Sequence, residues 1–114
     1  MGRGEVLEAL ERVVASRRGD APQKSYTARL LAGGVPKIAA TGTEEAGELV
    51  QAAAAETDDR VEAEAADLVY PVLVLLAARG LTLAAVEDEL ARRFGVSGLD
   101  EKASRAGGTT KGAT

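Results

Sequence analysis

The sequence contains neither cysteine nor histidine. The absence of cysteine excludes disulfides, thiolate nucleophiles and zinc-finger sites, and the absence of histidine excludes a Ser-His-Asp triad and an imidazole base. Any catalysis must therefore use carboxylates, lysine, tyrosine, hydroxyl groups or a hard metal ion. A cysteine-free chain without a signal peptide fits a reducing compartment, so we expect a cytoplasmic location.

Aromatic residues are also scarce, with one Phe, two Tyr and no Trp among 114 residues. A chain of this length forms one domain with a thin core, which Leu, Val and Ala have to fill. We expect a homodimer, because a second copy would cover apolar helix faces that such a core leaves exposed. The longest run without a charged residue, 68–78, is about half as long as a membrane-spanning helix, so we expect no membrane association.

Acidic residues are concentrated in one part of the chain. The formal net charge is −4, and half of the 18 Asp and Glu residues lie in 44–67, where Arg60 is the only basic residue. A chain with this charge is not expected to bind nucleic acid. The local concentration of carboxylates, by contrast, indicates a cation site.

Apolar residues recur at helical spacing along the chain, and no segment alternates as a strand does. Capping residues, glycines and prolines divide this pattern into helices that we expect at 4–17, 25–31, 36–55, 59–78 and 82–94. Gly42 leaves open a further break near 41–43. The sequence thus predicts an all-α bundle of four to five helices over 1–102, followed by a flexible tail at 103–114 that is poor in large apolar residues.

Two pairs of acidic residues stand out, each with its members three positions apart on one helical face. They are Glu45 with Glu48 and Glu64 with Asp67. The segment between the pairs is long enough for one helix to end and the next to return antiparallel, so the pairs can face each other. Converging carboxylates need cations, and oxygen ligands select hard metals such as Mg²⁺ or Mn²⁺. The alternative is an acidic, solvated surface, which the apolar neighbours and the lack of nearby bases disfavour.

At these residues the chain resembles the all-α nucleoside triphosphate pyrophosphohydrolases, whose hallmark is ExxE followed by ExxD. Within that group it is most similar to the phosphoribosyl-ATP pyrophosphatase family. The segments that carry the resemblance are SYTARLL (25–31), EEAGE (44–48), EAADLVY (64–70), VLVLLAARG (72–80) and SGLDEKASR (97–105). The Ser-Tyr-Thr segment is the specific part, because the acidic motifs alone would name only the larger group.

The resemblance implies an activity, namely hydrolysis of the α-β phosphate bond of phosphoribosyl-ATP in the second step of histidine biosynthesis. The products would be phosphoribosyl-AMP and pyrophosphate. It also implies that the metal binds to Glu45, Glu48, Glu64 and Asp67. Mg²⁺ would neutralise the triphosphate and lower the pKa of a bound water, and either Glu44 or Glu45 would take the proton.

The resemblance further implies a set of phosphate-binding residues around the start of the helix expected at 25–31, where backbone N–H groups and hydroxyls favour anions. They are Ser25, Tyr26, Thr27, Arg29 and Lys37. The alternative for Ser25 and Thr27 is that they only cap the helix, and the alternative for Lys37 is that it is surface charge.

Two positions depart from the family pattern. The family has a lysine-rich segment before the paired glutamates, where this chain has AATGT (39–43), and a histidine where this chain has Pro71. Fewer lysines would weaken phosphate binding, and a proline removes a helical hydrogen bond and should kink the helix. Two other functions therefore stay open. One is a pyrophosphohydrolase for another nucleoside triphosphate, and the other is a catalytically weak helical dimer used for interaction or regulation.

Overall fold

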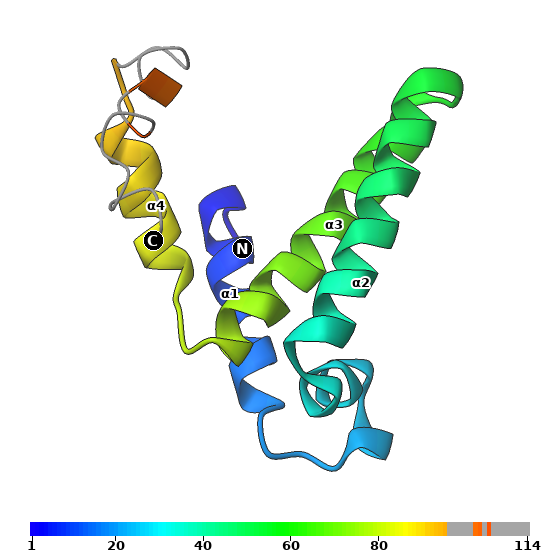
Figure 1. The fold of residues 1–114 in the computed structure, drawn as a ribbon, viewed down its shortest axis with the longest axis vertical. Helices are drawn as coiled ribbons and strands as arrows, with labels where there is room; N and C mark the ends of the chain where they lie inside the picture. Colours follow the sequence, from blue (N-terminus) through cyan, green and yellow to red (C-terminus); the bar gives the residue numbers. More distant parts are fainter. Residues whose placement is uncertain (96–101, 104, 106–114) are drawn as a thin grey trace. The chain divides into compact units, whose positions relative to one another are not determined.

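The computed structural model describes residues 1–95, 102–103 and 105, and within them it contains helices and no strand (Figure 1). The prediction of an all-α fold is confirmed. The elements are α1 (Arg3–Ser16), a short 3-10 helix (Pro22–Lys24), α2 (Tyr26–Ala55), α3 (Asp58–Ala78) and α4 (Leu83–Arg92). Most of the predicted tail at 103–114, and most of the 97–105 segment, lies outside the described residues.

The chain separates into two compact units, 1–83 and 84–114. The first contains α1, α2 and α3 and every residue that the sequence places in a site. The second contains nearly all of α4, where the carboxylate of Glu89 contacts Arg92 at 2.6 Å and Arg93 at 2.8 Å. No single helix among the described residues is long and apolar enough to cross a membrane. Only α3 and α4 taken together as a bent pair have the necessary length and composition.

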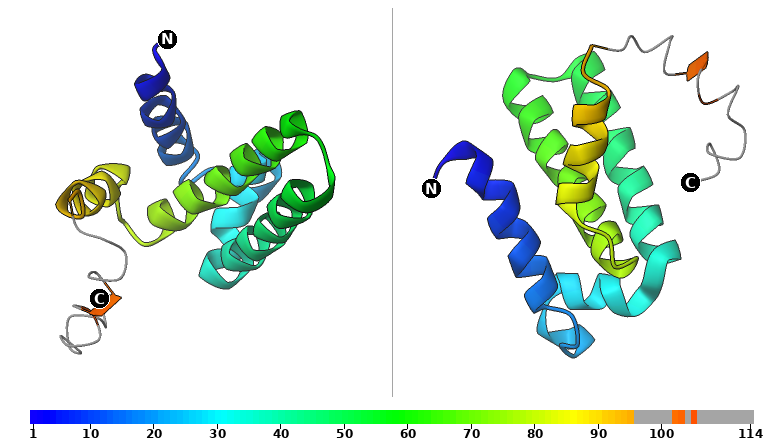
Figure 2. Two further views of the ribbon diagram at one scale, coloured as in Figure 1. Left: turned by 90° about the horizontal axis from the view of Figure 1, so that it is seen from above. Right: turned by 90° about the vertical axis from the view of Figure 1, so that its left-hand side faces the viewer.

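Helix α2 changes direction at Gly34. The backbone leaves helical geometry there with φ 79° and ψ −178°, a region open almost only to glycine, and Pro36 suits the first turn of the part that follows. The predicted division into 25–31 and 36–55 is therefore confirmed at the level of the backbone, and Figure 2 shows the short first part at an angle to the long second part. The further break considered near 41–43 is wrong, because the helix continues through Gly42.

The long second part of α2 packs antiparallel against α3, and these two helices share most of the contacts of the fold. Side chains cap both helices, since Ser25 accepts a hydrogen bond from the Ala28 N–H at 2.9 Å and Thr57 accepts one from the Arg60 N–H at 3.4 Å. Helix α3 runs without interruption through Pro71. The close approach at this point is helped by Gly42, where an added Cβ would lie 4.0 Å from the Pro71 Cβ.

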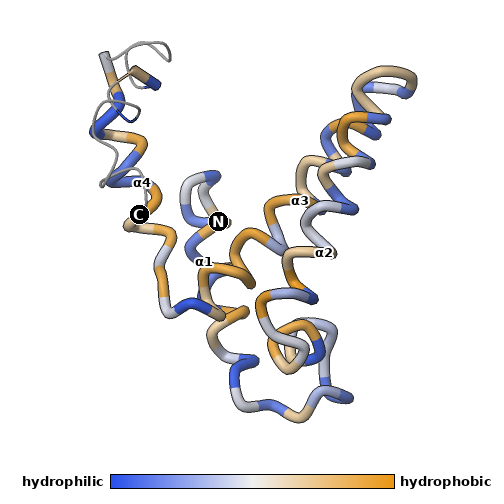
Figure 3. Tube along the Cα trace, in the orientation of Figure 1, coloured by the Kyte–Doolittle hydropathy of each residue, from blue (hydrophilic) through white to orange (hydrophobic). Residues whose placement is uncertain are grey.

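The core lies where α1, the start of α2 and the second half of α3 meet. Its buried members are Val14, Leu30, Ile38, Leu73 and Val74. Figure 3 shows the second half of α3 as a largely apolar stretch. This stretch is not buried on every side, because Val72 is 46% exposed and Val69 is also exposed. Among the described residues, α3 therefore keeps part of its apolar surface exposed.

Candidate functional site

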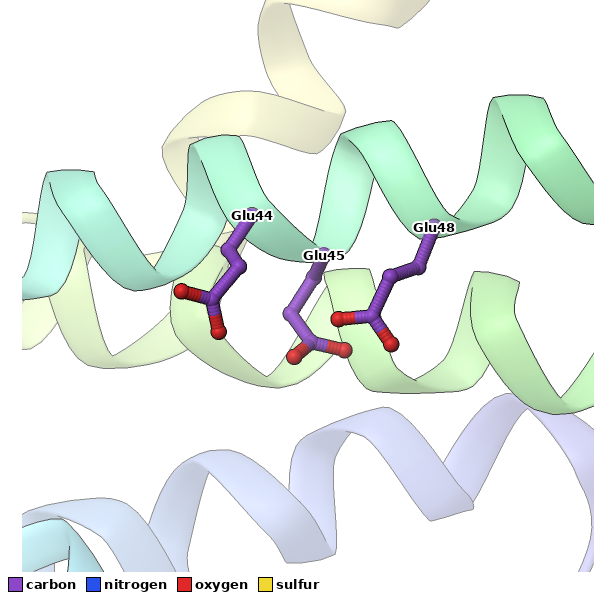
Figure 4. A group of neighbouring side chains, drawn as sticks. All are labelled: Glu44, Glu45 and Glu48. Atoms are coloured by element: carbon purple, nitrogen blue, oxygen red, sulfur yellow. The ribbon is translucent and has the colours of Figure 1, made fainter.

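The two acid pairs meet across the α2–α3 contact, as their spacing predicts. Carboxylate oxygens of Glu45, Glu64 and Asp67 all lie within 4.8 Å of one another. A second group of the same size lies along α2 and consists of Glu44, Glu45 and Glu48 (Figure 4). Figure 4 shows these three side chains leaving α2 on one side, with their carboxyl groups next to each other. Glu45 belongs to both groups and is therefore the centre of the arrangement.

The carboxylates differ in burial. Glu64 is only 4% exposed and Glu45 is half-buried, whereas Glu44, Glu48 and Asp67 are exposed. Glu48 lies one helical turn before Ala52, and the structure buries Ala52 but not Glu48. Glu48 therefore lies at the solvent edge of the site.

Arg60 supplies a counter-charge to the buried acid. Its Nη2 lies 2.9 Å from Glu64 Oε1, and its Nε lies 3.5 Å from Glu56 Oε1. Burial nevertheless raises the pKa of Glu64. Arg60 opposes that rise, while the neighbouring carboxyl groups of Glu48 and Asp67 add to it. The structure thus places a single guanidinium against a carboxylate that several other acids surround.

No basic side chain is among the groups that shift the pKa of Glu45. Burial raises the pKa of its carboxyl group, and the charges of Asp67, Glu64 and Glu44 raise it further. Every influence on this group acts in the same direction, against ionisation. A bound divalent cation would oppose the effect of all three neighbouring charges on the pKa of Glu45, because a positive charge favours the ionised carboxylate.

These donors fit a hard metal ion. All are carboxylate oxygens, the ligands that Mg²⁺ and Mn²⁺ prefer, and they come from two helices fixed by direct packing. Each group brings together three acids whose mutual repulsion a cation would relieve. The acidic clusters can therefore hold a metal ion.

An open pocket of about 260 Å³ adjoins the carboxylates. It is lined by Tyr26, Thr41, Glu45, Asp67, Tyr70 and Pro71. Sequence reasoning had assigned site roles to Tyr26, Glu45 and Asp67 but to none of the other three. Helical spacing could have found two of them, because Thr41 lies four residues before Glu45 and Tyr70 three residues after Asp67.

The five residues predicted to bind phosphate are not brought together in this pocket. Tyr26 lines it, but the Ser25 hydroxyl is used as the N-cap of α2, and Thr27 is buried. Arg29 and Lys37 are both exposed. The stem of Lys37 packs over Gly33, where an added Cβ would overlap it. The structure thus shows the Ser25 hydroxyl capping the helix, which was the alternative to a role in phosphate binding.

Comparisons with known proteins identify relatives of this chain. A sequence model of the family described as phosphoribosyl-ATP pyrophosphohydrolase matches residues 7–94. A phosphoribosyl-ATP pyrophosphatase of Erythrobacter litoralis is 52% identical over 99 residues, which cover 87% of this chain and 95% of the relative. Proteins with the same name from Paramagnetospirillum magneticum and Rhodospirillum rubrum are 53% identical over 102 residues and 50% identical over 101. The alignments cover 90% and 89% of this chain and 94% and 86% of those relatives. The chain belongs to the phosphoribosyl-ATP pyrophosphohydrolase family.

Proposed function

We propose that this protein hydrolyses phosphoribosyl-ATP to phosphoribosyl-AMP and pyrophosphate, and that it does so in the cytoplasm as the second step of histidine biosynthesis. The observation that carries the proposal is the pair of carboxylate groups that share Glu45 at the edge of a pocket. The names of relatives that are about half identical over nearly their whole length support the choice of substrate.

We propose Mg²⁺ as the metal, with Mn²⁺ as a substitute, held by Glu45, Glu48, Glu64 and Asp67. When bound, the ion neutralises phosphate charge and lowers the pKa of a coordinated water. Glu64 and Asp67 come from α3 and the other two acids from α2, so the α2–α3 packing sets the spacing of the ligands.

Glu44 is the proposed general base. Glu45 belongs to both carboxylate groups and is therefore engaged by a cation in either one, whereas Glu44 belongs to one group only and is exposed. An exposed carboxylate at the border of the site can accept a proton from the attacking water and release it to solvent.

Substrate phosphates need donors around the carboxylates. We propose that Arg29 and Lys37 provide them, because their side chains are accessible. Ser25 and Thr27 contribute in another way. The Ser25 hydroxyl caps α2 and Thr27 is buried, so together they fix the start of the helix that carries Tyr26 and Arg29.

A homodimer is the proposed assembly. Large apolar side chains remain exposed on α1, such as Val6 and Val13, and on α3, such as Val69 and Val72. A second copy would cover these faces. Light scattering at micromolar concentration should give twice the mass of the 11.7 kDa chain, and a monomer throughout would contradict this assembly.

The test of the activity is pyrophosphate release from phosphoribosyl-ATP with Mg²⁺, repeated after addition of EDTA. We expect turnover with Mg²⁺ and none with EDTA. A parallel panel of ATP, GTP, CTP and UTP separates the alternatives. Faster hydrolysis of one of these nucleotides would assign another substrate, and a folded protein with no turnover on any of them would favour the interaction role.

A further inference from the structure

The only two tyrosines of the chain face each other in the pocket. The rings of Tyr26 and Tyr70 are stacked, with centroids 6.4 Å apart and an angle of 21° between their planes. One comes from the first residue of α2 and the other from the middle of α3, so the pair forms only when the helices pack. The family resemblance implies a role in phosphate binding for Tyr26 and none for Tyr70.

Core packing does not account for this pair. Tyr26 is 52% exposed and is not part of the hydrophobic core, whereas Tyr70 packs against the core with part of its ring and lines the pocket with another part. An aromatic ring that leaves half of its surface in water gains little from burial. The pair therefore places two aromatic rings in the wall of the pocket.

The other pocket walls restrict the kind of group that fits there. Glu45 and Asp67 line the same pocket, so in the metal-free protein a phosphate placed against the tyrosines would meet two carboxylates. The volume of about 260 Å³ is below the ~300–1,000 Å³ of pockets that enclose a drug-sized ligand. It suits one ring system of a nucleotide rather than the whole molecule. Flat heteroaromatic bases stack on tyrosine faces whatever their hydrogen-bonding pattern.

We propose that Tyr26 and Tyr70 form the subsite for the adenine base of the substrate. The base stacks on the tyrosine pair at one end of the pocket, and the triphosphate extends from there towards the carboxylates. Burial raises the pKa of Tyr70, so its hydroxyl keeps its proton and can donate a hydrogen bond to a ring nitrogen. The identity of the nucleotide rests on the proposed function, whereas the stacking itself does not.

The experiment uses the tyrosines as their own reporters. With two tyrosines and no tryptophan, the ring resonances in an NMR spectrum can be assigned from Tyr26→Phe and Tyr70→Phe. AMP and ribose 5-phosphate are titrated separately into the metal-free protein up to millimolar concentration. We expect AMP to shift the resonances of both rings and ribose 5-phosphate to leave them in place. Equal shifts with the two probes, or no shift with AMP, would overturn the proposal.

Substitutions give a second readout. Tyr26→Phe keeps the aromatic face and should bind AMP about as well as the parent protein, whereas Tyr26→Ala should weaken binding by about tenfold or more. The same change should raise KM for phosphoribosyl-ATP more than it lowers kcat. Phe94→Ala, which removes an 83% exposed ring elsewhere in the chain, serves as the control and should change neither quantity. Parent-like AMP binding by Tyr26→Ala would remove the base from this subsite.

The two proposals can fail separately. Tyr70 also packs against the core, so a binding result for Tyr70→Ala counts only if the melting curve of this variant matches that of the parent. If it does not, AMP binding by Tyr26→Ala decides the test, because Tyr26 is half-exposed. AMP binding without metal needs no turnover. If the protein binds AMP at the tyrosines but does not hydrolyse phosphoribosyl-ATP, the activity is wrong and the base subsite stands. Turnover without any tyrosine shift leads to the reverse conclusion.

Discussion

Helices α2 and α3 carry acid pairs with identical spacing in different surroundings. On α3, the buried Glu64 has Arg60 one turn away, with their charged atoms 2.9 Å apart. On α2, Glu45 is half-buried among other acids, and the sequence has no basic residue between Lys37 and Arg60. The α3 pair thus has its own counter-charge, while the α2 pair has no basic residue beside it in the sequence. The spacing of the acids determines where the carboxylates lie, and the neighbouring side chains determine whether each carboxylate has a counter-charge.

The largest effect is expected from Glu48→Gln, which removes one charge from the α2 side. Removing the repulsion should leave the metal-free fold as stable as the parent or more stable. The loss of a metal ligand should reduce turnover by more than the roughly 10–100-fold typical of a partner outside the ligand shell. Pyrophosphate release and thermal melting with and without Mg²⁺ measure these effects, and Mg²⁺ should stabilise the variant much less than the parent.

Glu62→Gln is the matched control for this variant. Glu62 is an exposed acid on α3 that belongs to neither carboxylate group. Its replacement changes the net charge by the same amount, so it should leave activity and the magnesium response close to those of the parent. If Glu48→Gln hydrolysed phosphoribosyl-ATP at the parent rate, Glu48 would be an ordinary surface acid.

Arg60→Gln removes the counter-charge of the acid pair on α3. Neither acid pair then has a basic side chain beside it. Without its ion pair the buried Glu64 is less favourable, so the melting temperature of the metal-free protein should fall by about 4–8 °C, equivalent to about 1 kcal/mol. The rise in melting temperature on adding Mg²⁺ should become larger, because no guanidinium competes with the cation for Glu64. Thermal melting across a magnesium titration measures both changes.

Arg93→Gln breaks a comparable ion pair four residues apart, between Arg93 and Glu89 on α4 at 2.8 Å. It provides the control for a general loss of charge and should leave the magnesium response unchanged. A magnesium response in Arg60→Gln that is smaller than in the parent would mean that Arg60 orients Glu64 for the metal instead of competing with it.

The pH dependence of stability separates the acids of the site from the acid on α4. The folded-state pKa values of Glu45 and Glu64 are raised above 4.5. Their contribution to stability is therefore complete below pH 4.5 and is lost as pH rises through the raised values. The pKa of Glu89 is lowered to about 2 by hydrogen bonds from Arg92 and Arg93, so its contribution is lost as pH falls from 4.5 towards 2.

Melting curves of the metal-free protein should therefore shift to lower temperature as pH rises above 4.5. Glu45→Gln should reduce this shift, and Mg²⁺ should reverse it at neutral pH. The decrease below pH 4.5 that arises from Glu89 should be the same with and without Mg²⁺. A metal-free protein whose stability only increases from pH 4.5 to 7 would show that the carboxylates do not repel one another in the fold.

The smallest effect is expected from Pro71→His. Proline has no N–H, so the Asp67 carbonyl lacks its helical partner, and a residue with an N–H can restore that bond. Pro71 is buried opposite Gly42, which has no side chain of its own to contact it. We expect the melting temperature to rise by a few degrees, equivalent to about 0.5–1 kcal/mol. Pro71→Ala separates the backbone effect from that of the imidazole, and a fall in both variants would mean that the proline ring itself is required.

Local sequence features predicted much of the fold. Ser25 and Thr57 cap helices as expected, and the glycines before Pro36 mark the point where α2 changes direction. These features depend on neighbours within about four residues. The convergence of Glu45 with Glu64 and Asp67 was also predictable, because it follows from two antiparallel helices with acids at equivalent positions.

Other features depend on how each helix is rotated against its neighbours. The sequence could not tell that Glu48 faces solvent while Glu64 is buried, nor that Tyr70 meets Tyr26. Long-range bonds were equally out of reach. The Leu83 N–H, at the start of α4, donates to Glu11 Oε2 on α1 at 2.7 Å, across 72 positions of sequence. Such contacts are decided by tertiary packing, which periodicity does not encode.

The change of direction at Gly34 determines which residues of α2 can line the same pocket. In a straight helix, Tyr26 and Glu45 would be separated by about 28 Å along the axis, at 1.5 Å per residue. In the bent helix they line the same pocket of about 260 Å³. One residue with a backbone conformation open almost only to glycine thus brings Tyr26, at the start of α2, and Glu45, in the second part of the helix, to one pocket. A side chain at this position would separate the tyrosine that contacts the pocket from the carboxylates without altering either.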